Sequence, residues 1–128
     1  AWPETASLVR EYAGRGLRGV FHAFSDTLET YRTLRECGDF VFGIGGVVTF
    51  RKSALAEVVR GMELCDMVLE TDCPYLSPVP WRGKPNEPAL VAFTAETVAL
   101  ERGMDPAELW TLCGDNTRRF FNAPAKGL

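Results

Sequence analysis

A short apolar segment that ends in two carboxylates constrains the fold of this chain more than any other feature. Residues 67–69 are apolar, Glu70 and Asp72 follow them, and proline occupies position 74. Such a run is typical of a parallel strand with both faces covered, so we predict a strand over residues 66–71. Because α/β folds place their chemistry at the carboxyl ends of strands, Asp72 is a candidate catalytic or metal-binding residue. The alternative is that the two carboxylates only cap a helix or pair with arginines.

Two earlier segments, residues 17–24 and 40–48, have the same strand character. Each is followed by helical spacing of apolar residues, and strands that recur about every 20–26 residues suit right-handed crossovers in a parallel sheet. The sequence therefore predicts an α/β fold of three strand–helix units. The further predicted helices are 4–13, 28–38, 55–61, 88–101, one that starts with the cap at Asp105 and Pro106, and 117–121.

A parallel sheet of only three strands would leave both of its edges with unpaired backbone groups, which proteins normally avoid. The chain of 128 residues begins with Ala1 rather than methionine and contains enough sequence for one domain at most. We therefore expect residues 1–128 to form a single partial domain of a longer arrangement.

Composition limits the partners and the cellular location that we expect for this protein. A formal net charge of −3 argues against wholesale electrostatic coating of nucleic acid, although it allows local basic patches. No apolar run approaches the roughly 20 residues that span a bilayer, and the first residues do not resemble a signal peptide. Three of the four cysteines lie in apolar segments without metal-type spacing, which predicts buried free thiols in a reducing, cytoplasmic location.

Candidate site residues end the three predicted strands on the same side of the sheet. His22 ends the first strand, Thr49 follows the second, and Glu70 and Asp72 end the third. Zinc and harder divalent metals both accept mixtures of imidazole and carboxylate ligands. A histidine at a strand end can equally be a hydrogen-bonded structural residue, and that interpretation stays open.

Basic and aromatic residues alternate in the loops that leave this side of the sheet. Cations for phosphates and flat side chains for bases would suit a nucleic-acid surface on an otherwise acidic protein. A solvated loop with incidental charges is the alternative. The residues concerned are Arg51, Lys52, Arg82, Lys84, Phe24, Phe50, Tyr75 and Trp81.

The stretch from Glu70 to Pro88 strongly resembles the signature near the end of TatD-type metal-dependent deoxyribonucleases. Residues 19–25 resemble the strand of that family that bears a metal-binding histidine, and residues 46–51 resemble the strand and loop that come next. Residues 115–121 resemble the terminal helix of the family. The similarity covers nearly the whole chain in the right order.

The resemblance implies a (β/α)₈ TIM barrel with two divalent metal ions, to which this chain contributes the last three strand–helix units. Asp72 would be a ligand of one metal and the catalytic contact for its water, and His22 would be a ligand of the other metal. Glu70 would support these ligands. Arg82, Asn86 and Glu87 would brace the loop over the site, and Arg82 and Arg51 are candidates to face a substrate phosphate.

The departures from the family pattern concern the remaining ligands. The His-x-His of the first strand, the bridging glutamate of the fourth and the histidine of the fifth have no counterpart, since the chain contains one histidine. Ala23 and Asp26 also replace the usual cysteine and glycine.

We therefore expect part of a hydrolase that cleaves DNA, with RNA as a further candidate substrate, inactive without the N-terminal half of its barrel. The alternatives are a non-catalytic α/β module that binds partners or oligomerises, and a hydrolase of another ester or amide.

Overall fold

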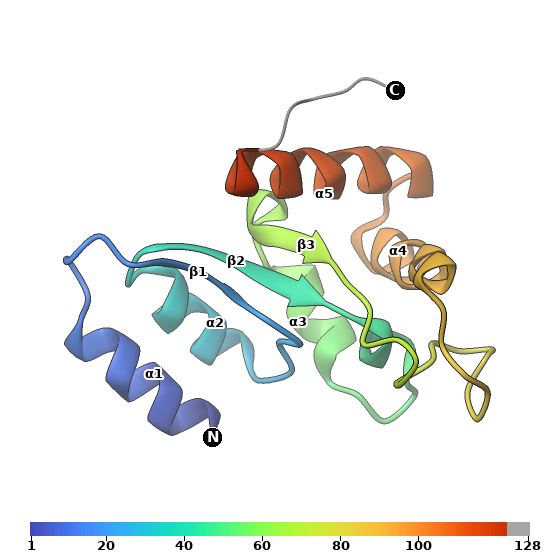
Figure 1. The fold of residues 1–128 in the computed structure, drawn as a ribbon, viewed down its shortest axis with the longest axis horizontal. Helices are drawn as coiled ribbons and strands as arrows, with labels where there is room; N and C mark the ends of the chain where they lie inside the picture. The colour runs from blue at the N-terminus through green and yellow to red at the C-terminus, as the bar shows by residue number, and fades with distance from the viewer. Residues whose placement is uncertain (123–128) are drawn as a thin grey trace.

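The computed structural model describes residues 1–122, which form a parallel three-stranded sheet with helices packed against it (Figure 1). The strands are β1 (Arg18–Phe21), β2 (Asp39–Ile44) and β3 (Met67–Leu69), and they lie in the order β1-β2-β3. Val20 is the register partner of Val41 across the first ladder, and Gly43 is the partner of Val68 across the second. The predicted parallel α/β arrangement is therefore confirmed.

Helices connect the strands and follow the last of them, and several begin or end at the predicted residues. The Thr27 side chain accepts a hydrogen bond from the Thr30 N–H, and Asp105 does the same for two N–H groups at the start of the last helix. Gly103 ends the preceding helix in the left-handed conformation. The α-helices are α1 (Trp2–Glu11), α2 (Leu28–Arg35), α3 (Leu55–Gly61), α4 (Val91–Arg102) and α5 (Pro106–Phe121), and the 3₁₀ helices are η1 (Gly46–Thr49), η2 (Leu64–Asp66) and η3 (Pro88–Leu90).

All three observed strands are shorter than those predicted over 17–24, 40–48 and 66–71, and two predicted elements differ further. The second strand stops at Ile44, because the chain turns at Gly45 into η1. A Cβ on Gly46 would lie 2.7 Å from the Leu76 carbonyl oxygen, so this glycine allows the later loop to approach closely. The helix predicted over 117–121 is only the end of the 16-residue helix α5, since one interior glycine does not stop a helix.

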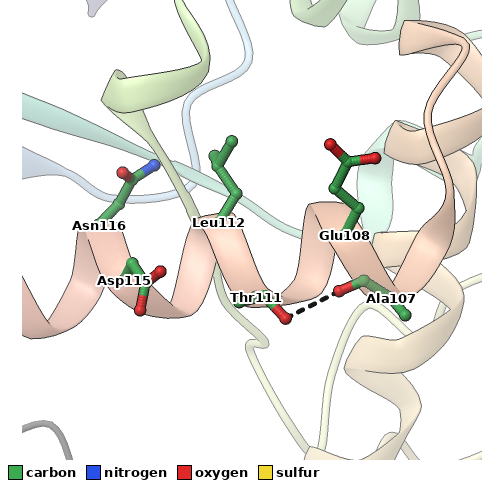
Figure 2. A pocket seen from close by; sticks show the side chains of 6 residues that line it. All are labelled: Ala107, Glu108, Thr111, Leu112, Asp115 and Asn116. Carbon is green, nitrogen blue, oxygen red and sulfur yellow. Dashed lines mark hydrogen bonds between the residues drawn. The ribbon is translucent and has the colours of Figure 1, made fainter.

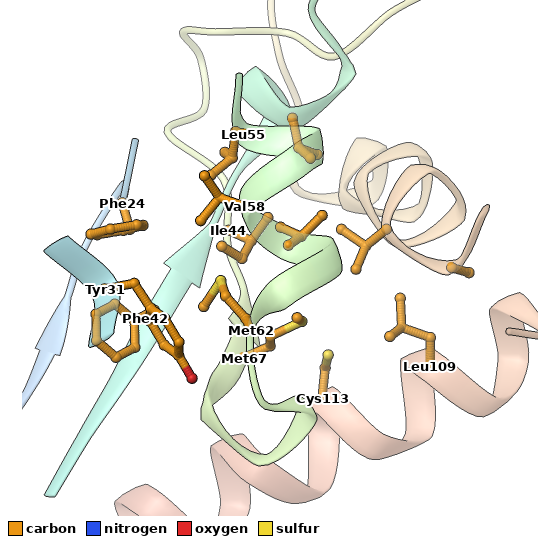
Figure 3. Close-up of a cluster of buried hydrophobic side chains, with 14 of the residues drawn as sticks. Phe24, Tyr31, Phe42, Ile44, Leu55, Val58, Met62, Met67, Leu109 and Cys113 are labelled. Carbon is orange, nitrogen blue, oxygen red and sulfur yellow. The ribbon is translucent and has the colours of Figure 1, made fainter. Parts of the chain in front are cut away.

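Most of the hydrophobic core lies between the sheet and the helices α1 to α4, and Leu109 and Cys113 of α5 also belong to it. Figure 3 shows Phe24, Tyr31 and Phe42 in contact on one side of this core, where Phe42 lies edge-on to both other rings. On the opposite face of the sheet, Phe120 of α5 packs on Val41 and Val68. Phe121, the next residue of α5, is 60% exposed.

A buried polar contact joins α2 to η2 below the sheet. The Tyr31 hydroxyl donates a hydrogen bond to Asp66 Oδ2 over 2.6 Å and accepts one from the Glu63 N–H over 3.0 Å. Arg35 pairs with the same Asp66 carboxylate, so this buried acid has both a hydroxyl and a cation beside it.

The four cysteines are free thiols, but only Cys37 and Cys113 are buried. The expectation of three buried cysteines was therefore wrong: Cys65 lies on the surface turn η2, and Cys73 lies in the loop after β3. Among the described helices, none combines the length and the apolar character needed to cross a membrane.

Candidate metal centre

His22, Glu70 and Asp72 meet at the edge of the sheet where the strands end, which we call the carboxyl edge. His22 directly follows β1, and the two acids follow β3. The His22 Nδ1 atom lies 2.9 Å from Glu70 Oε2, and its Nε2 atom lies 2.9 Å from Asp72 Oδ1. The structure thus brings together three of the four residues predicted at strand ends, and the two acids contact opposite nitrogens of one imidazole ring.

Glu70 reaches His22 by lying across β2, where residue 43 is glycine. A Cβ at position 43 would lie 1.8 Å from Glu70 Oε2, so no other residue leaves room for this carboxylate. The other oxygen, Oε1, accepts a hydrogen bond from the Ala23 N–H. Ala23 has a left-handed backbone, with φ of 50°, and this turn aims its N–H at the carboxylate.

The two carboxylates change the acidity of the histidine. The hydrogen bond and the negative charge of Glu70 raise the pKa of His22 above its ordinary value, and Asp72 adds to the effect. The His22 side chain is 63% exposed, so water weakens its interactions with the two carboxylates. The two carboxylates therefore favour the protonated form of the His22 imidazole.

The donors at the carboxyl edge suit a divalent metal in kind but are too few to hold one alone. Imidazole nitrogen and carboxylate oxygen are ordinary ligands for zinc and for harder divalent ions. Within residues 1–122, however, no group of three or more His, Cys, Asp or Glu side chains has an arrangement that could hold a metal ion. Tight metal sites in proteins use about three or more protein ligands.

Some of the predicted basic and aromatic residues of the neighbouring loops form pairs at the surface, whereas one of them, Phe24, lies in the core. The Arg82 guanidinium stacks 3.7 Å above the Phe50 ring, and the Lys84 ammonium lies 5.1 Å from the centre of Trp81. Tyr75 is largely exposed. Phe24, which was predicted to belong to this surface, instead lies in the core at 1% exposure, because the chain turns inward after Ala23.

The long loop after β3 is tied down by side chains that reach across it. Asn86 is buried; its side-chain amide donates to the Tyr75 carbonyl and its backbone N–H to the Pro74 carbonyl. The Glu87 N–H in turn donates to Asn86 Oδ1. These contacts make Asn86 a brace of the loop.

Thr49 braces the loop after β3, a role that no local sequence pattern indicates. Its hydroxyl oxygen accepts a hydrogen bond from the Val79 N–H over 2.9 Å and donates one to the Gly46 carbonyl. Thr49 therefore links η1 to the loop after β3. Arg51, in the turn that follows η1, is exposed.

A small cavity of about 150 Å³ opens next to Asp72, and Ala23, Ser25, Gly45 and Leu76 are among the residues that line it. A larger hollow of about 530 Å³ lies elsewhere, and Figure 2 shows that its lining comes from a single helix, α5. Thr111 there donates its hydroxyl to a carbonyl of its own helix. The candidate site is therefore the cavity lined by Asp72, whose carboxylate also contacts His22.

Comparison with known proteins gives one consistent result. Residues 1–122 match the family model described as TatD related DNase. The chain is 38% identical over 126 residues to the uncharacterized metal-dependent hydrolase YcfH of Escherichia coli K12. This match covers 98% of this chain and 47% of YcfH. It is 32% identical to the uncharacterized metal-dependent hydrolase YabD of Bacillus subtilis, covering 94% of this chain and 48% of that protein.

A solved structure agrees with the sequence matches. The crystal structure of YJJV, a TatD homologue from Escherichia coli, superimposes with a TM-score of 0.84 at 26% identity, over 96% of this chain and 47% of that one. The predicted fold, part of a TIM barrel, is confirmed by this match, and the chain spans about half the length of the relatives that it resembles. This chain belongs to the family of TatD-related DNases, whose curated members are described as metal-dependent hydrolases.

Proposed function

We propose that this chain supplies His22 and Asp72 to a two-metal centre that hydrolyses phosphodiester bonds of DNA. The observation that carries the proposal is the 2.9 Å approach of His22 Nε2 to Asp72 Oδ1 at the carboxyl edge. Two side chains that are 50 positions apart in the sequence meet there, from the ends of the two outer strands of one sheet. In α/β folds this edge is where substrates bind.

Each of the three residues has a distinct role in this proposal. Glu70 holds Nδ1 of His22 and so fixes the direction of the other nitrogen, as carboxylates that support metal-binding histidines do. Asp72 orients the attacking water and takes up its proton. A pair of divalent cations, when bound, would lower the pKa of the water and neutralise charge on the phosphate.

The cations around the site favour an anionic substrate over a neutral ester or amide. Arg82 and Lys84 each lie against an aromatic ring, which limits the conformations of two long side chains before any substrate arrives. Arg82 forms bidentate hydrogen bonds to phosphate more readily than a lysine does. The exposed Arg51 adds a third positive charge on a loop of the same edge.

We further propose that the remaining metal ligands come from outside these residues. His22 and Asp72 would provide one ligand for each metal, and Glu70 is already engaged with Nδ1 and with the Ala23 N–H. We therefore expect the 128-residue chain alone to show no hydrolysis of DNA with Mn²⁺ or Mg²⁺. Activity of the purified chain that disappears in Asp72→Ala would contradict this expectation.

A chimaera tests the proposed chemistry directly. This chain would replace the matching segment of Escherichia coli YcfH, with which it shares 38% identity. We expect hydrolysis of a DNA oligonucleotide that depends on Mn²⁺ or Mg²⁺ and that falls by 10²-fold or more, in order of magnitude, in Asp72→Ala. Asp115→Ala is the matched control, because Asp115 is an acid on α5 whose partner is the neighbouring Arg118.

The possible outcomes separate the candidate functions. A folded chimaera that cleaves a carboxylic ester but not DNA would assign the site to another class of ester. A folded chimaera that binds Mn²⁺ and cleaves neither would favour a non-catalytic module. Equal activity of the Asp72→Ala and Asp115→Ala variants would refute the role of Asp72.

A further inference from the structure

Asn116 is a polar residue on the buried side of the last helix, α5. The other residues that α5 buries are Leu109, Cys113 and Phe120. Asparagine is one of the weaker helix formers, and burial of its amide costs free energy unless hydrogen bonds replace those made to water. Asn116 is nevertheless only 3% exposed, and Figure 2 shows its amide projecting from α5 on the same side as Leu112. Its place in the helix is therefore explained by the contacts of its amide.

The Asn116 amide binds the segment that leads into β3. Its Nδ2 atom donates to the Leu64 carbonyl over 2.7 Å and to the Met67 carbonyl over 2.8 Å. An amide nitrogen has two hydrogens, so both of them are used. Oδ1 accepts a hydrogen bond from Arg119 Nη1 over 3.1 Å, and Nη2 of this arginine donates to the Cys65 carbonyl over 2.7 Å. Asn116 and its arginine partner thus hold three carbonyl groups of η2 and the start of β3.

The same segment is held from another side by α2. Asp66 lies between the residues that α5 binds, and its carboxylate contacts Tyr31 and Arg35 of α2. β3 itself pairs with β2 over only three residues. The side-chain contacts to the start of β3 therefore supplement a short ladder and resist sliding of the strand along its axis.

The far end of this strand leads to the two acids of the candidate metal centre. Asp72 lies five residues after Met67, at most about 16 Å away for an extended chain. Glu70 crosses β2 where residue 43 is glycine, and a Cβ there would lie 1.8 Å from its carboxylate. Val41, the preceding residue on that face of β2, offers no such gap. A shift of β3 along β2 would therefore displace Glu70 and carry Asp72 with it.

We propose that Asn116 is a positioning residue of the candidate metal centre: by holding the start of β3, it sets where the two acids meet His22. As a contribution to catalysis this role rests on the proposed function, whereas the placement of the acids can be observed in the chain alone. Misplacement of a reacting group by about 1 Å can reduce a rate on the order of 10²-fold. A contact at the opposite edge of the sheet therefore matters to the chemistry at the carboxyl edge.

Two variants loosen the start of β3, and each has a control on the same helix. Asn116→Asp keeps the shape of the side chain but removes both N–H donors. Its control, Leu109→Ala, weakens the core at the other end of α5 and leaves the Asn116 amide in place. Arg119→Met is a change at an exposed position that removes the contact with the Cys65 carbonyl. Its control is Arg118→Met, because Arg118 pairs within α5.

NMR spectra of the 128-residue chain report the placement of the acids without using catalysis. In the wild type, the Ala23 N–H is bonded to Glu70, and the His22 ring lies against Asp72. A hydrogen bond to a carboxylate moves an amide proton downfield. We therefore expect Asn116→Asp to shift the Ala23 amide proton upfield and to lose the NOE between the His22 ring and the Asp72 side chain.

The other variants separate position from stability. Arg119→Met should give smaller changes of the same kind, whereas Leu109→Ala and Arg118→Met should keep both signals, even where Tm falls as far as in Asn116→Asp. All spectra are recorded below the melting transition of each variant, where circular dichroism shows that it is folded.

Kinetics of the chimaera with YcfH test whether the position matters for the reaction. We expect Asn116→Asp to reduce kcat by about tenfold or more and to change KM by less than about twofold, because the acid is misplaced while the loops that contact substrate are not. Leu109→Ala should leave both constants within about twofold of the wild-type chimaera.

Several results would overturn the proposal. One is a set of wild-type NMR signals in folded Asn116→Asp, and another is equal signal changes in Leu109→Ala. If Asn116→Asp does not fold, wild-type signals in Arg119→Met, or signals that match those of Arg118→Met, would overturn it. Expected NMR changes with a chimaera that cleaves nothing would support the positioning role and count against the proposed chemistry alone.

Discussion

Replacing Gly43 with alanine tests whether Glu70 is the group that orients His22. The new Cβ would lie 1.8 Å from Glu70 Oε2 and 2.3 Å from its carboxyl carbon, far inside any van der Waals contact. The backbone of β2 is held by a ladder on each side, so the Glu70 side chain must move instead. We expect the carboxylate to leave both His22 and the Ala23 N–H.

The magnitude follows from the two hydrogen bonds that would be lost. A hydrogen bond to a charged group contributes about 1.5–3 kcal/mol. The hydrogen bond between Glu70 and His22 contributes less, nearer the ~0–1 kcal/mol of a surface pair, because the imidazole ring is well exposed. The free energy of unfolding should therefore fall by roughly 2–3 kcal/mol. At about 3–5 °C per kcal/mol for a chain of this size, Tm should fall by roughly 6–15 °C.

The assay combines thermal unfolding with an NMR titration of the only histidine in the chain. In the wild type we expect the pKa of His22 to be raised, and in Gly43→Ala to return toward the ordinary value of about 6.5. Gly45→Ala is the control, since a Cβ there meets Glu70 atoms only at 3.8 and 3.9 Å. An unchanged pKa in Gly43→Ala, or an equal loss of stability in Gly45→Ala, would refute the reasoning.

The raised pKa of His22 also predicts how the stability difference between wild type and Gly43→Ala depends on pH. A pKa that is raised on folding stabilises the protein fully below the unfolded pKa of histidine, and this contribution is lost as pH rises through the folded value. The stability difference between wild type and Gly43→Ala should therefore be smaller at alkaline pH than at pH 6. The hydrogen bond from the Ala23 N–H to Glu70 does not involve the imidazole, so part of the difference should persist.

Two further substitutions test contacts away from the imidazole. Tyr31→Phe should lower the free energy of unfolding by about 1–3 kcal/mol in denaturant titrations, because a buried carboxylate loses its hydroxyl donor, whereas Tyr12→Phe on the surface should change it by less than about 0.5 kcal/mol. Thr49→Val should speed proteolytic cleavage within residues 72–87, because the loop loses its link to η1; Thr111→Val, whose hydroxyl bonds within its own helix, should leave cleavage unchanged. Equal behaviour of either variant and its control would contradict the assigned contact.

Much of the fold could be predicted from the sequence because local signals and the global arrangement agree. Apolar runs at regular intervals indicated parallel strands, and the caps at Thr27, Gly103 and Asp105 fell where the residue types placed them. The end of β2 could not be predicted, since Val47 and Val48 continue the strand pattern. The turn into η1 depends on a contact between Gly46 and a loop some 30 positions later, which no local pattern shows.

The candidate site was predictable in its membership but not in its connections. Strand ends on the same side of a sheet must lie together, so His22, Glu70 and Asp72 could be grouped from their positions alone. That Glu70 crosses over Gly43, and that the Ala23 N–H meets it there, depends on register and on a left-handed residue. Phe24 shows the same limit: whether an aromatic residue after a strand faces solvent or the core is decided by the turn.

The contact between His22 and Asp72 depends on how both outer strands are aligned with β2. The two outer strands, β1 and β3, do not pair with each other. His22 and Asp72 are therefore positioned through the ladders that join β1 and β3 to β2. A slip of one residue in either ladder would carry one partner along by about 3.3 Å and turn it to the opposite face. This contact therefore forms only when both ladders are in register, so its recovery after refolding reports correct strand alignment, which helix content does not.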